Sequence, residues 1–117
     1  HERLQHLDLI TLPTVKTDRE SSWHLFPIRL NLDMITKNRA QIIDELKNNN
    51  VGVGVHFMPV HQHLYYSETF KLDDKNYPVA SGAFPRLMSL PIYPGMTDKS
   101  VEKVINTLIE ILNKYRR

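Results

Sequence analysis

The sequence predicts a single small domain of the α+β (α/β) class that spans residues 1–117. Two observations lead to this prediction: a strand, helix, strand order between Trp23 and Val55, and an amphipathic helix that begins after Thr97. The composition agrees, because 41% hydrophobic and 24% charged residues are typical of a globular protein with one ordinary core. No apolar run approaches the roughly 20 residues of a membrane span, so we expect no membrane partner.

The net charge of the chain is small, at +2 with the histidines neutral. The cations are dispersed, and without a basic stripe we expect no nucleic-acid partner. The chain has no cysteine, which rules out a disulfide framework and is compatible with a reducing compartment. The cytoplasm is the default expectation. It opens at His1 without a methionine, in what resembles the tail of an earlier helix around Leu4 and Leu7. We therefore expect a piece of a longer protein.

The first predicted elements are a polar connector over residues 13–22 and a strand over residues 23–32. The side chains on one face of this strand are His24, Phe26, Ile28 and Leu30. Pro27 cannot donate a ladder hydrogen bond, which indicates an edge strand or a bulge. We expect Trp23 and Phe26 to pack in the core rather than to stack on a ligand.

An amphipathic helix is predicted next, with Thr36 as its N-cap and its end at the asparagine run 48–50. The residues that give it helical spacing are Arg39, Ile42, Ile43 and Leu46. Asparagine tolerates the left-handed backbone that ends helices, which explains the stop. Alternating valines predict that the chain returns as a strand over residues 51–55.

Several short elements and one long helix are predicted in the remaining chain. Residues 64–77 form short helical turns or a folded loop, and Pro78 is placed to start a helix that ends before Pro85. A short apolar strand follows over residues 87–90. Thr97 then caps the final helix, whose apolar positions are Val101, Val104, Ile105, Leu108, Leu112 and Tyr115.

The segment that follows the helix stop, VGVGVHFMPVH at residues 51–61, is the best candidate for binding or chemistry. Gly52 and Gly54 remove side chains from it, so we expect another backbone or a ligand to approach closely there. His56, His61 and His63 lie close together in sequence, but their spacing matches no zinc pattern with fixed geometry. We therefore expect no metal site.

Other chemistries find little support in the residues. The chain has no cysteine nucleophile and no Gly-x-Ser-x-Gly elbow, which argues against a hydrolase. Its eight lysines all lie in polar sequence, so none is expected to form an imine. The residue types leave two roles open for His56 and His61, ligand binding through the imidazole or packing within the loop.

Taken in order, several motifs resemble one family. They are SWHLFPIRL at residues 22–30, VGVGVHFMPVH at 51–61, the tyrosine pair at 65–66 and LPIYPGMT at 90–97. Together they resemble the C-terminal small domain of the pyridoxal phosphate (PLP)-dependent nucleotide-sugar aminotransferases, the DegT/DnrJ/StrS family. Within that family the pattern is closest to enzymes that aminate the C4 keto group of UDP-linked sugars.

This resemblance implies the small C-terminal domain of a fold type I PLP-dependent transferase, with a short, mostly antiparallel sheet packed by helices. It implies a homodimer that moves an amino group from glutamate to a nucleotide-linked keto sugar for cell-surface polysaccharide precursors. A missing N-terminal large domain would supply the cofactor lysine and most contacts to PLP, so residues 1–117 alone should be inactive. No catalytic or cofactor-binding residue is then expected in this chain.

Carried over to this sequence, the resemblance implies substrate contacts from His61, His56, Phe57 and His24, with His61 the best candidate. The competing hypothesis is a free-standing small α+β module that binds a ligand or a partner without catalysis. Composition and element order are compatible with either hypothesis.

Overall fold

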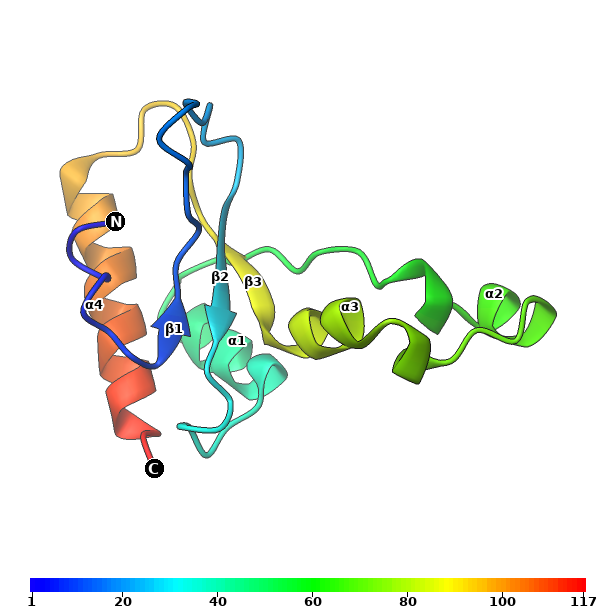
Figure 1. The fold of residues 1–117 in the computed structure, drawn as a ribbon. Coiled ribbons are helices and arrows are strands. Elements are labelled where there is room, and N and C mark those ends of the chain that lie inside the picture. Colours follow the sequence, from blue (N-terminus) through cyan, green and yellow to red (C-terminus); the bar gives the residue numbers. More distant parts are fainter.

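A three-stranded antiparallel sheet lies at the centre of the fold, in the order β1 (Ile10–Thr11), β2 (Phe26–Leu30), β3 (Leu87–Leu90). The computed structural model describes residues 1–117. Two helices complete the main part of the molecule, α1 (Arg39–Asn48) and α4 (Asp98–Lys114). From this body a narrow segment, residues 55–83, projects to one side (Figure 1). We call residues 55–83 the arm and the rest of the chain the body.

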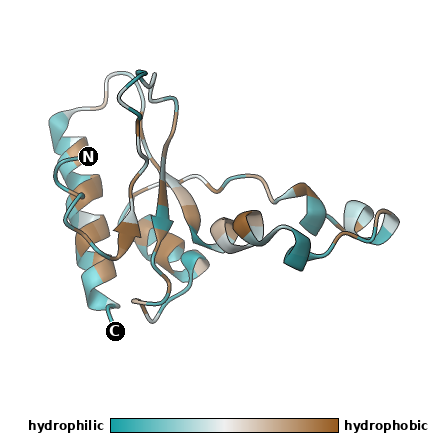
Figure 2. Cartoon of the chain, in the orientation of Figure 1, coloured by the Kyte–Doolittle hydropathy of each residue, from teal (hydrophilic) through white to brown (hydrophobic).

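One face of the sheet forms the core with the two helices. Ile28 faces Met88 and Phe26 faces Leu90 across β2 and β3, so these side chains share one side of the sheet. The helix side chains that join them in a single buried cluster are Ile42, Leu46, Val104, Leu108, Ile111 and Leu112. Hydrophobic residues gather accordingly on α1 and α4 (Figure 2). The predicted α+β class, a short antiparallel sheet packed by helices, is confirmed.

Both long helices lie where the sequence places them. Helix α4 begins after Thr97, whose side chain accepts a hydrogen bond from the Ser100 N–H. Helix α1 ends at Asn48, and Asn50 has the expected left-handed backbone with φ of 58°. The N-cap predicted for α1 is wrong, because Asn38 and Gln41 form a reciprocal capping box there. None of the helices is long and apolar enough to cross a membrane.

Strand β2 is shorter than predicted because Trp23 has a positive φ of 50°, which takes residues 23–25 out of the strand. The strand is also central in the sheet, so the edge position predicted from Pro27 is wrong. Pro27 lies opposite Ser89, whose backbone N–H and C=O both bond to Gly54 instead. The nitrogen of Pro27 therefore faces the other side of β2, where β1 has already ended at Thr11.

Residues 51–55 do not form the predicted strand. They make a single bridge, between Gly54 and Ser89, at the outer edge of β3. Val51 is instead buried, and its N–H bonds to the carbonyl of Leu46 at the end of α1. The first residues form turns rather than the tail of a helix, and the two-residue strand β1 that follows them was not predicted.

The arm consists of short helical pieces, as the sequence suggests. They are η1 (Val60–Gln62), α2 (Leu64–Thr69), η2 (Asp74–Asn76) and α3 (Pro78–Ala83), after which η3 (Phe84–Arg86) leads into β3. Pro78 occupies the first turn of α3, as predicted. Helix α2 lies near the tip of the arm, and α3 returns toward the body (Figure 1).

Arg39 fixes the base of the arm to the body. Its guanidinium donates hydrogen bonds to the carbonyls of Phe84 and Leu87, the latter at 2.9 Å, and it lies over the Phe84 ring. This contact couples the start of α1 to the point where the chain returns from the arm to β3.

The chain ends are tied to the body by ionic contacts. Arg116 donates two hydrogen bonds to the Asp8 carboxylate, at 2.7 and 3.0 Å, and lowers its pKa. The Tyr115 hydroxyl donates to Glu45 at 2.6 Å and, with the charge of Lys114, lowers the pKa of that carboxyl. These contacts hold the end of α4 against α1 and the first turns of the chain.

Candidate functional site

The candidate loop leaves the body at Gly54, where β3 holds it in place. The Gly54 N–H bonds to the Ser89 carbonyl at 2.9 Å, and the Ser89 N–H bonds to the Gly54 carbonyl at 2.8 Å. The Ser89 backbone thus pairs with Gly54, but nothing within this chain approaches either glycine so closely that a side chain would be excluded. A Cβ on Gly54 would meet Ser89 Cβ at an ordinary 3.8 Å, and one on Gly52 would meet nothing within 4 Å.

Ser89 also holds the first histidine of the loop. Nε2 of His56 lies 2.8 Å from the Ser89 hydroxyl oxygen, and Ser89 is buried. Either the hydroxyl donates a hydrogen bond to an unprotonated Nε2, or a protonated Nε2 donates one to the hydroxyl. In both cases Nδ1 remains available to bind a ligand. Three hydrogen bonds to one buried residue thus fix both the backbone and the ring of this segment.

Phe57 follows directly and is 99% exposed. A phenylalanine side chain in water loses the free energy that its burial would give, about 1.5–3 kcal/mol. Its neighbours Val55 and Met58 are exposed as well. The loop therefore presents an apolar side chain next to a histidine whose orientation is fixed, an arrangement suited to contacting a ring with polar substituents.

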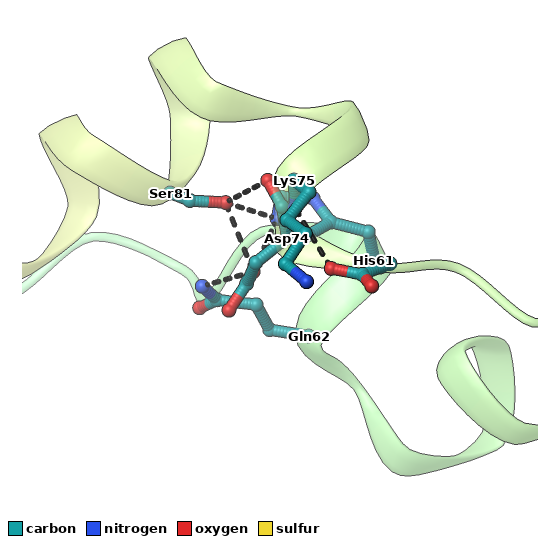
Figure 3. Close-up of polar contacts among 6 residues, drawn as sticks. His61, Gln62, Asp74, Lys75 and Ser81 are labelled. Carbon is teal, nitrogen blue, oxygen red and sulfur yellow. Dashed lines mark hydrogen bonds and ion pairs between the residues drawn. The ribbon is translucent and has the colours of Figure 1, made fainter.

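His61 occupies a different environment, inside the arm. It is 7% exposed, and its ring stacks on Tyr77 with centroids 4.5 Å apart. Nε2 of His61 lies 2.9 Å from the Ser81 hydroxyl and 3.0 Å from a carboxylate oxygen of Asp74 (Figure 3). That same oxygen accepts hydrogen bonds from Gln62 and Ser81, each at 2.9 Å. The cluster joins η1, η2 and α3.

The cluster of His61, Asp74 and Ser81 has the residue types of a hydrolytic triad but not its geometry. In a triad the acid bonds to one ring nitrogen and the nucleophile to the other. Here Asp74 and Ser81 both contact Nε2, and the Ser81 hydroxyl donates a hydrogen bond to the Asp74 carboxylate. The arrangement cross-links the arm, and it offers no path for activating the serine.

The pKa of Asp74 is lowered, first by the hydrogen bond from the Gln62 amide and then by the one from the Ser81 hydroxyl. Both donors stabilise the ionised carboxylate. The cluster is therefore held most firmly when Asp74 carries its charge. His61 also borders an open hollow of about 680 Å³ that includes Lys71 and Asp73.

The other histidines lie apart from each other. His63 donates to the Met58 carbonyl at 3.1 Å, and His24 is exposed beside Trp23, whose ring stacks on Phe26 at 5.5 Å. Trp23 and Phe26 thus pack together at the margin of the core and are only partly buried. No group of three histidine, aspartate or glutamate side chains is arranged to hold a metal ion.

Sequence reasoning missed the partners of both candidate histidines. Ser89 falls in a stretch predicted only as an apolar strand, and its pairing with Gly54 appears only in the structure. Asp74 and Ser81 lie 13 and 20 residues from His61, in short helical pieces whose packing no periodicity reveals. Of the four predicted substrate contacts, the structure gathers His56 and Phe57 in one loop at the start of the arm. It places His61 farther along the arm, in η1, and His24 before β2.

Known proteins match nearly the whole chain. The profile of the DegT/DnrJ/EryC1/StrS aminotransferase family matches residues 1–109. The chain is 39% identical over 116 residues to the uncharacterized protein MJ1066 of Methanocaldococcus jannaschii, covering 99% of this chain and 30% of MJ1066. It is 34% identical over 109 residues to the spore coat polysaccharide biosynthesis protein SpsC of Bacillus subtilis, covering 92% of this chain and 28% of SpsC.

A solved structure also matches the fold of this chain. Spr1654 of Streptococcus pneumoniae, whose name calls it a sugar aminotransferase, was solved in a PMP form. It matches with a TM-score of 0.82 and 27% identity, over 97% of this chain and 28% of that chain. Its PLP form gives the same TM-score. The chain thus spans about three tenths of the proteins that it matches. On the family match and these identities, the chain belongs to the DegT/DnrJ/EryC1/StrS aminotransferase family.

Proposed function

We propose that residues 1–117 form the C-terminal domain of a longer, homodimeric PLP-dependent aminotransferase, which transfers an amino group from glutamate to a nucleotide-linked keto sugar. Three findings support this proposal: the family match, the short share of each relative that the chain covers, and a neighbour solved in PLP and PMP forms. The name of SpsC supports a role in polysaccharide precursor synthesis. The motif around His56 and Phe57 supports a UDP-linked 4-keto sugar as the finer proposal.

The residues of this chain do not fit the cofactor itself. PLP enzymes of this kind hold PLP through a lysine imine, and such a lysine needs a sheltered environment to lose its proton. None of the eight lysines is buried. We therefore assign the cofactor to polypeptide outside residues 1–117, and we expect the chain alone to transfer no amino group.

The part that we assign to this chain is recognition of the sugar. One observation carries this assignment: the loop is fixed to β3 through Ser89, and it presents a fully exposed Phe57 beside the oriented His56. An imidazole nitrogen binds a sugar hydroxyl, and an apolar ring packs against the C–H face of a sugar. We propose that His61 and His24 form further parts of the same site.

The test uses the longer protein that we propose contains these residues. Phe57→Ala should raise the KM for the keto sugar about tenfold, the loss expected for a small apolar contact. The KM for glutamate should stay constant, because the proposal assigns the loop to the sugar alone. Val101→Ala, which shortens an exposed valine on α4, is the matched control and should change neither constant.

Two results would contradict the proposal at different levels. A longer protein that neither binds PLP nor transfers an amino group would disprove the aminotransferase function. An active enzyme whose sugar KM and kcat are the same in the wild type, Phe57→Ala and His56→Asn would disprove the role assigned to the loop.

A further inference from the structure

Large apolar side chains are exposed both near the tip of the arm and on α3, and nothing in this chain covers them. Tyr65 is 67% exposed, Leu64 71% and Val79 85%. The other large apolar or aromatic side chains exposed between residues 60 and 83 are Val60, Tyr66, Phe70 and Tyr77. Tyr65, Tyr66 and Phe70 also contact one another near the tip, with ring centroids 5.3–6.5 Å apart.

The arm lacks a hydrophobic core of its own. None of the fifteen buried hydrophobic side chains lies between residues 55 and 83. Fixing each backbone residue costs about 1–2 kcal/mol, whereas an internal hydrogen bond returns only about 1 kcal/mol net. The polar cluster at His61 cannot offset that cost for the whole arm. Burial of the exposed aromatic and aliphatic side chains against a partner is the contribution that is missing.

The chemistry of this surface indicates what covers it. The arm carries Lys71 and Lys75 against Glu68, Asp73 and Asp74, so it has no positive charge to attract nucleic acid or an anionic membrane. Tyrosine, phenylalanine and methionine are the residue types enriched where two protein surfaces meet. An exposed apolar patch of this kind on an otherwise polar protein marks a protein contact.

The relatives supply the candidate partner. The matched stretch is 30% of MJ1066 and 28% of SpsC, so most of each relative lies outside it. We propose that the outer arm, residues 60–83, docks on that remaining part of the aminotransferase polypeptide through Leu64, Tyr65, Tyr66, Phe70, Tyr77 and Val79. This inference rests on the proposed function, and it identifies the surface that joins this domain to the rest of the enzyme.

Thiol labelling tests the docking, because residues 1–117 contain no cysteine. Single cysteines are introduced by Leu64→Cys, Tyr65→Cys and Val79→Cys in the arm and by Glu102→Cys on the exposed side of α4 as the control. Each is measured in the 117-residue chain and in the longer protein. In the longer protein the arm thiols should react at least about tenfold more slowly than in the chain, and the control thiol equally fast in both.

Equal labelling of the arm thiols in the two proteins would overturn the inference. So would arm thiols that become protected in the 117-residue chain as its concentration rises, because the partner would then be a second copy of the arm. A natural gene product no longer than these residues would overturn it as well. Amino transfer is assayed separately, so failure of the proposed function is distinguished from failure of docking.

Discussion

The body contains all fifteen buried hydrophobic side chains, on β-strands, α1, α4 and the segments beside them, whereas the only buried side chain in the arm is His61. The two regions therefore depend on different interactions. Apolar burial stabilises the body in proportion to area and needs no partner. The arm depends on hydrogen bonds around Asp74 and leaves its large apolar side chains exposed. The hydrophobic core of this chain therefore lies in the body, and the exposed side chains of the arm agree with the docking that we propose.

The largest change in the free energy of unfolding should come from truncating a core side chain of the body. Leu108 on α4 is fully buried, so Leu108→Ala should lower the free energy of unfolding by about 2–5 kcal/mol. Chemical denaturation of the 117-residue chain measures this value. Glu102→Ala on the exposed side of α4 should change it by less than about 0.5 kcal/mol. Similar losses of unfolding free energy in the two variants would show that Leu108 is not part of a stabilising core.

Ser89→Ala tests the junction between the two regions. It removes the hydroxyl that holds His56, so it should cost about 1 kcal/mol and free the imidazole to reorient. The ¹⁵N chemical shifts of the His56 ring report the change directly. Ser22→Ala, in the exposed connector, is the control. Unchanged His56 shifts in Ser89→Ala would mean that Ser89 does not orient the ring.

Asp74→Asn tests whether the charge of Asp74 holds the arm, because the variant should remove the pH dependence of the cluster. The folded pKa of Asp74 is depressed, so its contribution is present above the ordinary aspartate value of about 3.9 and is lost as pH falls through the lower folded value. The His61 ring signals, shifted by the stacked Tyr77, should therefore move toward unfolded positions below about pH 4 in the wild type. The amide that replaces the carboxylate has no charge to lose, so this step should be absent in the variant.

Asp44→Asn, on the exposed side of α1, controls for general acid effects. The body also weakens in acid with the same sign, because Asp8 and Glu45 have depressed pKa values. The cluster has no role in holding the arm if the His61 signals titrate identically in wild type and Asp74→Asn.

The smallest change in the free energy of unfolding should come from truncating an exposed apolar side chain of the arm. Leu64→Ala in the 117-residue chain should change the free energy of unfolding by less than about 0.5 kcal/mol, because the side chain is exposed and alanine favours helix. Calorimetry or denaturation of the same chain measures it. A loss comparable with that of Leu108→Ala would show that Leu64 is buried in solution, and the comparison of body and arm would fail.

The body was more predictable from sequence than the arm, for a physical reason. Periodic burial leaves a periodic pattern, and it located β3 and α4 at their observed ends. Residues 51–55 have the pattern of a strand without the pairing, because only Gly54 reaches a partner. Strand β1 is two residues long and has no period to detect.

The sequence indicated which loop to propose as the site, but it did not indicate the hydrogen bonds of that loop. The run of histidines, an aromatic and a proline indicated the loop, and family resemblance indicated the chemistry. The hydrogen bonds that separate an oriented His56 from a buried His61 depend on Ser89 and Ser81, which are distant in sequence. Contacts of this kind follow from tertiary packing and leave no local signal.

Amide hydrogen exchange in the 117-residue chain tests the central claim most directly. The α4 amide of Leu108 should exchange only through global unfolding. The amides of Ser67 in α2 and of Phe70 at its C-cap should exchange at least about a hundredfold faster, through local opening of the arm. That result would establish that the body is stable in this chain alone and that the arm is not. Equal protection of α2 and α4 would contradict the account, because the arm would then be stable without any partner.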